Sequence, residues 1–137
     1  MRAYDAAMGL FGDSGEKRAR EARARAESDR LAGLPVAALA VEVMAAFGPG
    51  GIAAKSGHRQ GPIEVTEWLF STTSTKVRYR QPVLGPVIEA LALLDRSGLL
   101  GRSSFGSASA GASTYHATRL GEEALAEGSV VRQLAGV

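Results

Sequence analysis

The sequence contains no cysteine in its 137 residues. This absence excludes a disulfide framework, a thiolate zinc site and a cysteine nucleophile. No apolar run approaches the roughly 20 residues that a membrane-spanning helix needs. Residues 1–12 lack the basic-then-apolar layout of a signal peptide. Since a chain of this length suits one compact domain, we expect a single-domain cytoplasmic protein without a membrane segment.

Histidine is scarce as well, since the chain has only His58 and His116. Neither has a carboxylate at metal-binding spacing, so we expect no metal site and no catalytic pair. The sequence also lacks a Gly-x-Ser-x-Gly nucleophile elbow and a phosphate-binding loop that ends in Gly-Lys-Ser/Thr. These absences predict a protein without catalytic residues or cofactors, and not an enzyme.

Positive charge is only in small excess, with 16 Lys and Arg against 14 Asp and Glu. Its location is more informative than its total. Residues 52–80 contain five basic side chains and two acidic ones, whereas residues 1–51 are balanced and residues 81–137 are slightly acidic. The five basic residues are Lys55, Arg59, Lys76, Arg78 and Arg80. We therefore look for a binding function in the middle third of the chain.

Residues 16–31 are rich in Ala, Arg and Glu, which are strong helix formers. Opposite charges recur four residues apart, as at Glu21 and Arg25, and each such pair contributes a few tenths of a kcal/mol. The segment has no wide apolar stripe, so we expect a helix that projects from the molecule or lies loosely on its neighbour. Two interpretations remain open, a solvated helix or an arm that contacts a second subunit or phosphates.

Two apolar helices follow. Pro35 opens a helix whose apolar residues recur at helical spacing over residues 36–47, and its only charge is a single glutamate. We predict that this helix is buried on most sides, and that the glycines and proline at 48–51 end it. A second helix is expected at about 62–71, with Trp68 on the apolar face and therefore in the core.

Residues 71–81 have poor helix propensity and are predicted to form an extended, basic connection. A third helix is expected to begin at Pro82 or Pro86 and to end at Gly98. Its apolar stripe consists of Leu84, Val87, Ile88, Leu91 and Leu94. The outward face is then Gln81, Gly85, Glu89, Ala92 and Arg96.

Two short strands are expected at 102–105 and 113–118, around a Gly/Ser/Ala tip at 106–112. A last helix begins near Leu120 and is interrupted at Gly128. The sequence thus predicts a mainly α fold with a small β-hairpin. We divide it into a charged N-terminal segment (1–34), a central domain (35–127) and a helical tail (128–137).

Two segments carry a family resemblance. Val87 to Arg102 contains a Leu-x-x-x-Gly-Leu pattern at the end of the third helix, and residues 115–121 form a Tyr-x-x-Thr-x-x-Gly pattern. In this order, with a hairpin-length gap, they resemble the entry into and exit from the wing of winged helix-turn-helix bacterial transcriptional regulators. Regulators of the MarR and PadR kind come closest, and the resemblance covers about residues 35–127.

The resemblance implies a homodimeric regulator that contacts double-stranded DNA through the third helix, its basic flank and the hairpin. A major groove admits one helix, and Lys and Arg beside it hold phosphates. We expect the charged N-terminal helix and the segment Val130–Leu134 to form the dimer. The residues expected to contact DNA are Lys55, Arg59, Lys76, Arg78, Arg80, Gln81 and Arg102.

Two alternatives stay open. The hairpin tip has no Lys or Arg, Glu64 and Glu67 are acidic, and some ten residues separate the second and third helices, where helix-turn-helix motifs usually have three or four. These features favour a winged helix that binds a protein partner and has little affinity for DNA. The other alternative is a sensor that binds an effector between the core and the dimer helices.

Overall fold

The computed structural model describes residues 2–52, 60–70, 77–103 and 114–136. Over these residues the fold is mainly helical with one antiparallel hairpin, which confirms the predicted fold class at this level. The elements in order are α1 (Arg2–Gly33), α2 (Val36–Met44), the 3-10 helix η1 (Ala45–Phe47), α4 (Pro62–Leu69), α5 (Val77–Arg96), β1 (Leu100–Ser103), β2 (Thr114–Ala117), α6 (Arg119–Glu127) and α7 (Val130–Ala135).

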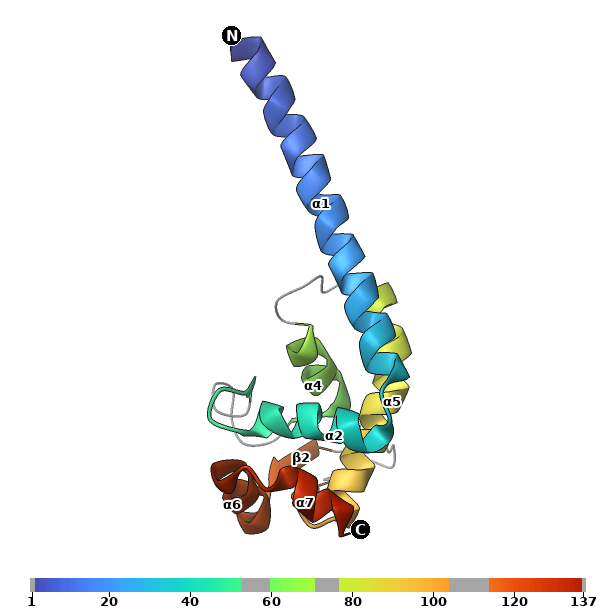
Figure 1. Ribbon diagram of the computed structural model, residues 1–137, viewed down its shortest axis with the longest axis vertical. Coiled ribbons are helices and arrows are strands. Elements are labelled where there is room, and N and C mark those ends of the chain that lie inside the picture. The colour runs from blue at the N-terminus through green and yellow to red at the C-terminus, as the bar shows by residue number, and fades with distance from the viewer. Residues whose placement is uncertain (1, 53–59, 71–76, 104–113, 137) are drawn as a thin grey trace.

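Helix α1 is much longer than the rest and extends away from the helical body, with its C-terminal part beside α5 (Figure 1). The predicted helix over 16–31 is confirmed. The expectation that it lies loosely is wrong for its last turns, because Ala24, Ser28 and Leu31 are buried. Their spacing of four and three places them on one face. Because Ala24 and Ser28 are small, α1 and α5 can approach closely, so a narrow buried stripe is enough for α1 to pack on the body.

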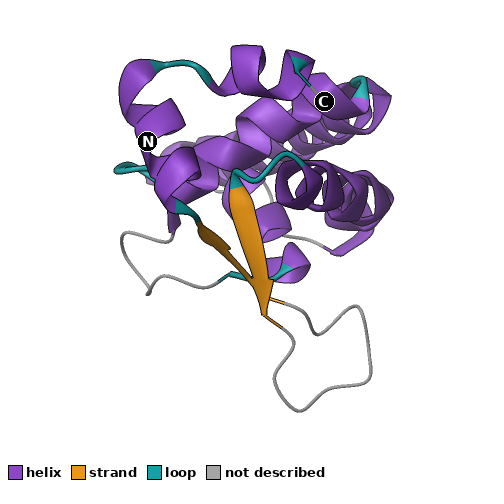
Figure 2. Cartoon of the chain, turned by 90° about the horizontal axis from the view of Figure 1, so that it is seen from below, coloured by secondary structure: helices purple, strands orange, loops and turns teal. Residues whose placement is uncertain are grey.

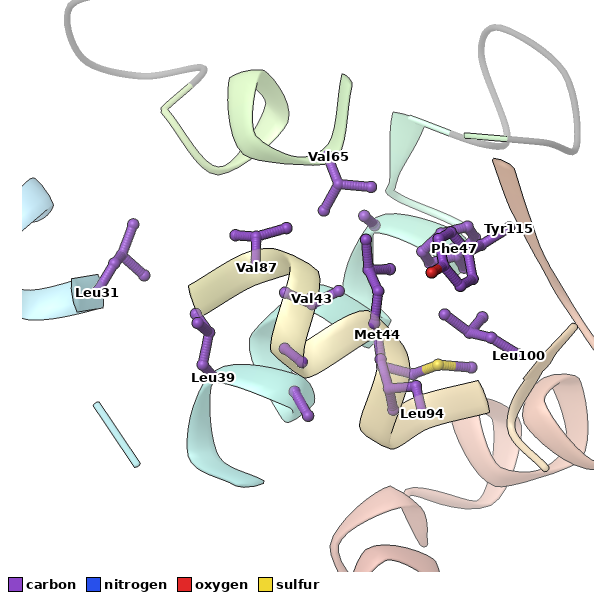
Figure 3. Packing of buried hydrophobic residues seen from close by; sticks show 14 of the residues in the cluster. Leu31, Leu39, Val43, Met44, Phe47, Val65, Val87, Leu94, Leu100 and Tyr115 are labelled. Atoms are coloured by element: carbon purple, nitrogen blue, oxygen red, sulfur yellow. The ribbon is translucent and has the colours of Figure 1, made fainter. Parts of the chain in front are cut away.

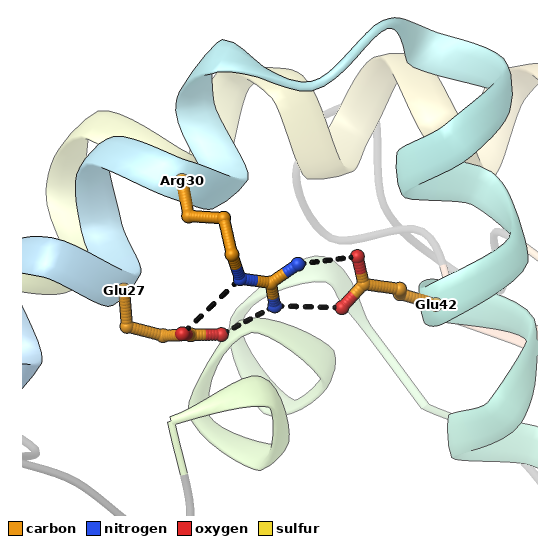
Figure 4. Close-up of polar contacts among 3 residues, drawn as sticks. All are labelled: Glu27, Arg30 and Glu42. Atoms are coloured by element: carbon orange, nitrogen blue, oxygen red, sulfur yellow. Dashed lines mark hydrogen bonds and ion pairs between the residues drawn. The ribbon is translucent and has the colours of Figure 1, made fainter.

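A corner at residues 33–35 separates α1 from α2, and an arginine spans it (Figure 4). The two terminal nitrogens of Arg30 each donate to one carboxylate oxygen of Glu42, both at 2.8 Å. Its Nε donates to Glu27 at 3.2 Å. The two carboxylates raise the pKa of the Arg30 guanidinium above its ordinary value. This solvent-exposed cluster ties α1 to α2 across the inside of the corner (Figure 4).

The core lies between α2 and α5 (Figure 3). Leu39, Val43 and Met44 of α2 are fully buried, as are Val87 and Leu94 of α5. The prediction that the helix over 36–47 is central to the core is thereby confirmed. Each such side chain contributes about 1.5–3 kcal/mol when it leaves water.

Helix α5 begins earlier than the sequence predicts. It starts at Val77 and runs through Pro82 and Pro86, so the extended connection expected over 71–81 is wrong for residues 77–81. A proline inside a helix costs about 3 kcal/mol or more. The helix continues because Tyr79 and Val83, which precede the second proline, are buried on the core side. Their packing offsets the missing backbone hydrogen bonds.

The end of α5 is where the sequence predicts it. Gly98 has φ +81°, the left-handed conformation that favours glycine. The backbone N–H of Leu99 donates to the carbonyl of Leu94 at 3.0 Å, and that of Gly98 donates to Asp95 at 3.1 Å. This is the Schellman arrangement. It turns Leu99 and Leu100 back into the core, where both are buried, as expected.

Strands β1 and β2 pair with Leu100 opposite Ala117 and Arg102 opposite Tyr115. The hairpin is confirmed, although its first strand starts two residues before the predicted one; the tip expected at 106–112 lies outside the described residues. Figure 2 shows the strands projecting from the layer of helices. Gln60 adds a short bridge on the other edge of β2, exchanging two 2.8 Å backbone hydrogen bonds with Tyr115. The sheet therefore joins three separate segments of the chain.

Helix α6 begins against the end of α5. The hydroxyl of Thr118 accepts from the backbone N–H of Gly121 at 3.0 Å, which caps the helix, and donates to the carbonyl of Gly98 at 2.5 Å. A Cβ on Gly121 would lie 2.0 Å from the carbonyl oxygen of Leu99, so only glycine fits there. Gly128, with φ +69°, ends α6, as predicted.

Candidate nucleic-acid interface

Helix α5 packs on α2, α4 and α1 with one face and leaves the opposite face open. Tyr79, Val83 and Val87 lie on the buried face. The outward face contains the residues expected from the sequence and also Ile88, whose assignment to the buried apolar stripe is wrong, because its side chain is 42% exposed. Gln81, Gly85, Glu89 and Arg96 are exposed, and Ala92 is half-buried.

Arg78 lies in the first turn of α5 and its side chain is 62% exposed. Its guanidinium lies 4.8 Å from the centre of the Tyr79 ring and donates to the Tyr79 hydroxyl at 2.9 Å. Its Nη2 is also 3.6 Å from a carboxylate oxygen of Glu21 on α1. Arg78 is thus accessible, and α1 holds it at the side of α5 nearest the long helix.

Arg80 has a different environment, with a side chain that is only 18% exposed. Its Nη1 donates to Glu67 of α4 at 2.5 Å, and its Nε is buried without a hydrogen-bond partner among the described residues. Arg80 therefore joins α4 to α5, and its charge is balanced within the protein. The sequence pattern predicts a phosphate contact for this side chain, but in this structure it pairs with Glu67.

A hollow of about 230 Å³ lies beside this ion pair, between α4 and α5. Ile63 of α4 is 55% exposed at its edge, although it is a large apolar residue. The other lining residues are Thr66, Glu67, Arg80, Gln81 and Leu84. The outward side of the α4–α5 pair is therefore partly apolar, with Gln81 among the residues that line the hollow.

The hairpin contributes Arg102, which is exposed on β1 opposite Tyr115. Burial raises the pKa of the Tyr115 phenol, and Asp95 adds to the effect, while the hydrogen bond and charge of Arg102 oppose it. The imidazole of His116 lies against Gly101 on the neighbouring strand, where a Cβ would be 2.8 Å from the ring. Arg102 is thus exposed on β1, the strand that directly follows the C-terminal end of α5.

The sequence-predicted site residues therefore fall into three groups. Arg78, Arg80 and Gln81 share the first turns of α5, and Arg102 lies beyond its other end. Lys55, Arg59 and Lys76 lie outside the described residues, as does His58.

Sequence reasoning missed three features of this region. The pairing of Arg78 with Glu21 and of Arg80 with Glu67 joins residues far apart in the chain, and no local spacing indicates it. The Gln60 bridge is a single residue pair, too short for a strand pattern. The exposed Ile63 could have been recognised, because it falls off the apolar face that Val65, Trp68 and Leu69 define.

Trp68, predicted to lie in the core, is half-buried and packs against it. It also lines a second hollow of about 270 Å³ with Glu42, Ala45 and Leu69. Both hollows are smaller than the roughly 300–1,000 Å³ of usual small-molecule sites. Within the described ranges, no group of three or more His, Asp or Glu side chains is placed to hold a metal ion.

In the part of the chain that the structure describes, no single helix is long and apolar enough to cross a membrane. One pair of consecutive helices, residues 15–33 and 36–47, is together long and apolar enough to span a membrane, by length and composition only. The pair is bent by 119° where the two helices meet. The second member of this pair forms the buried centre of the core.

The chain matches no protein-family model, no curated protein and no solved structure at a significant level.

Proposed function

We propose that the protein is a winged-helix DNA-binding regulator, which contacts duplex DNA through the outward face of α5, its first turn and the hairpin. One observation carries this proposal. The two sequence patterns typical of a wing meet at a single junction. There the Thr118 hydroxyl donates to the carbonyl of Gly98, and Gly121 packs closely against the carbonyl of Leu99. Each residue that the patterns specify has a local structural role there, as a helix cap, a buried side chain or a close approach.

The order of elements supports the same proposal. Three helices (α2, α4 and α5) precede a hairpin whose second strand also pairs with Gln60, between the first two of these helices. This order is the one that a winged helix-turn-helix requires. It leaves one face of the third helix open and positions the hairpin directly after that helix, so that both can contact one duplex.

The charges define how this interface would work. Arg78 and Arg96 are exposed near the two ends of α5, and Arg102 is exposed on the hairpin. A helix N-terminus and nearby cations hold phosphates, and they position the protein without reading sequence. Lys55, Arg59 and Lys76 remain predicted contacts. Arg80 acts in this scheme through Glu67, as a residue that positions α5 on α4.

A titration of fluorescence anisotropy against salt tests the proposal. The probe is a mixed-sequence duplex of about 20 base pairs, measured with the full chain at several salt concentrations. Each lost phosphate contact lowers the slope of log affinity against log salt by about one. We expect this decrease for Arg78→Ala and for Arg102→Ala, and no change for Arg132→Ala, an exposed arginine on α7. An absence of salt-sensitive binding even at low salt refutes the proposal.

We propose further that the regulator is a cytoplasmic homodimer of a bacterial cell, with α1 and the C-terminal segment as the subunit contact. In that segment Val130 and Leu134 are buried within the chain itself, while Val131 is 64% exposed. A second subunit would therefore meet Val131 and the projecting part of α1. Light scattering coupled to size exclusion should give a dimer mass for the full chain, and a monomer mass at all concentrations contradicts this part.

The second candidate function is the binding of a protein partner. The apolar hollow beside the exposed Ile63 favours it, as does the neutralisation of Arg80 by Glu67. Exposed glutamates at 64 and 89 repel phosphates and suit a basic partner. The same salt titration separates the two functions, because a protein-binding surface of this kind gives no salt-dependent affinity for duplex DNA.

A further inference from the structure

A straight stripe runs along the outward face of α5. Gln81, Gly85, Ile88 and Ala92 are spaced four, three and four residues apart, which places them on one line of the helix. Ile88 is 42% exposed, whereas Val87 and Leu91 of the same helix are fully buried. Beyond Gln81, no side chain of the stripe can form a hydrogen bond.

The neighbours of the stripe are charged. Arg78 and Arg96 lie beside it near the two ends of α5, both exposed, and Glu89 lies next to Ile88. Gly85 has no neighbouring atom within 4 Å of the place where a Cβ would be. The middle of the stripe is thus open backbone that a ligand can approach closely, and positive charge near both ends complements a polyanion.

Each base pair presents a distinct pattern in the major groove. Adenine offers an acceptor and a donor that a glutamine amide binds in a bidentate manner, and thymine offers a methyl group that apolar side chains contact. Guanine is read mainly by Arg or Lys, neither of which occurs in the stripe. The chemistry of Gln81 and Ile88 therefore corresponds to A·T pairs.

From this chemistry, and on the basis of the DNA-binding function proposed above, we propose that α5 reads A·T pairs in the major groove, with Gln81 on an adenine and Ile88 on a thymine methyl group. The two residues are seven positions apart, or about 10.5 Å along the helix axis. At 3.4 Å per step of a strand, that corresponds to about three base pairs. Each half-site then has two A·T pairs at this separation.

The experiment begins with selection of duplexes by the full chain from a random-sequence library. The best duplex is then made with uracil in place of thymine, which removes only the methyl groups. A buried methyl group is worth about 0.8 kcal/mol, or about fourfold in affinity, so a duplex with two half-sites should bind about sixteenfold more weakly. Ile88→Ala, which keeps only one methyl group at this position, should discriminate between the two duplexes less than the unchanged protein does. Gln81→Ala should lose the adenine preference and keep the discrimination between thymine and uracil.

Val36→Ala is the matched control, because Val36 is 41% exposed at the start of α2 and away from the stripe. Circular dichroism confirms that each variant is folded before binding is measured. Salt-dependent binding without A·T enrichment, equal affinity of the unchanged protein for both duplexes, or undiminished discrimination by Ile88→Ala overturns the reading of thymine and leaves the DNA-binding function intact. No duplex binding at low salt overturns both.

Discussion

Replacement of Gly121 by alanine tests the junction between α5, the hairpin and α6 most directly. The added Cβ would lie 2.0 Å from the carbonyl oxygen of Leu99 and 2.9 Å from the terminal methyl group of Met44. Side chains with a real Cβ essentially never approach closer than 3.0 Å. The methionine end can move, but the backbone carbonyl cannot, so α6 must shift by about 1 Å, which places the change among overpacking substitutions.

Overpacking of this kind costs about 1–3 kcal/mol and occasionally more. The shift also separates the Thr118 hydroxyl from the carbonyl of Gly98 and from the N–H of residue 121, and each lost hydrogen bond costs about 1 kcal/mol. Better helix propensity of alanine returns at most about 1 kcal/mol. We therefore expect Gly121→Ala to lower the free energy of unfolding by about 2 kcal/mol or more.

The assay is urea unfolding followed by circular dichroism, with the slope of the transition compared between variants. Gly15→Ala is the matched control, because Gly15 lies in α1 and a Cβ added to it would have no neighbouring atom within 4 Å. It should leave stability unchanged or raise it by up to about 1 kcal/mol. If Gly121→Ala is as stable as this control at the same slope, the close approach to Leu99 is refuted, and with it the junction that supports the winged-helix proposal.

Three further predictions concern stability. Pro82→Ala should raise the free energy of unfolding by about 1–2 kcal/mol in the same urea assay, because it returns a backbone N–H donor to an exposed turn of α5. An unchanged or lower value would contradict a helix that continues from Val77 through residue 82. Arg30→Lys cannot keep the two-pronged contact with Glu42 and should cost at most about 1 kcal/mol at low salt, a difference that 1 M salt removes. The raised pKa of Tyr115 means that the unfolded chain loses this proton first, so stability should fall as the pH rises above about 10. Tyr115→Phe should show a smaller fall over the same range, and an equal fall would refute the assignment.

The helix ends were predictable because their signals are local. Gly98 and Gly128 occupy left-handed positions that a sequence pattern marks directly, and the apolar spacing of residues 36–47 identified the central helix. The start of α5 was not predictable in this way. Prolines at 82 and 86 are local signals against a helix, whereas the burial of Tyr79 depends on packing with other elements, which no local pattern records.

The candidate site was predictable only in part. The outward face of α5 followed from helical periodicity, so Gln81 and Gly85 were placed correctly on it. The environment of the arginines did not follow, because ion pairing depends on which helix lies alongside. Arg78 and Arg80 are two residues apart and have the same charge, yet one is exposed beside α1 and the other is largely buried against α4.

The long N-terminal helix acts mechanically as a lever. Its 32 residues span about 48 Å, and among residues 15–33 the buried side chains are Ala24, Ser28 and Leu31, in the last three turns beside the Arg30 cluster. A force at the distal end would therefore act on these last turns with a long lever arm. Glu21, whose carboxylate lies 3.6 Å from Arg78, is the contact through which such a torque would reach the first turn of α5. Whatever binds the far end of α1 would therefore also act on the first turn of α5, through the contact between Glu21 and Arg78.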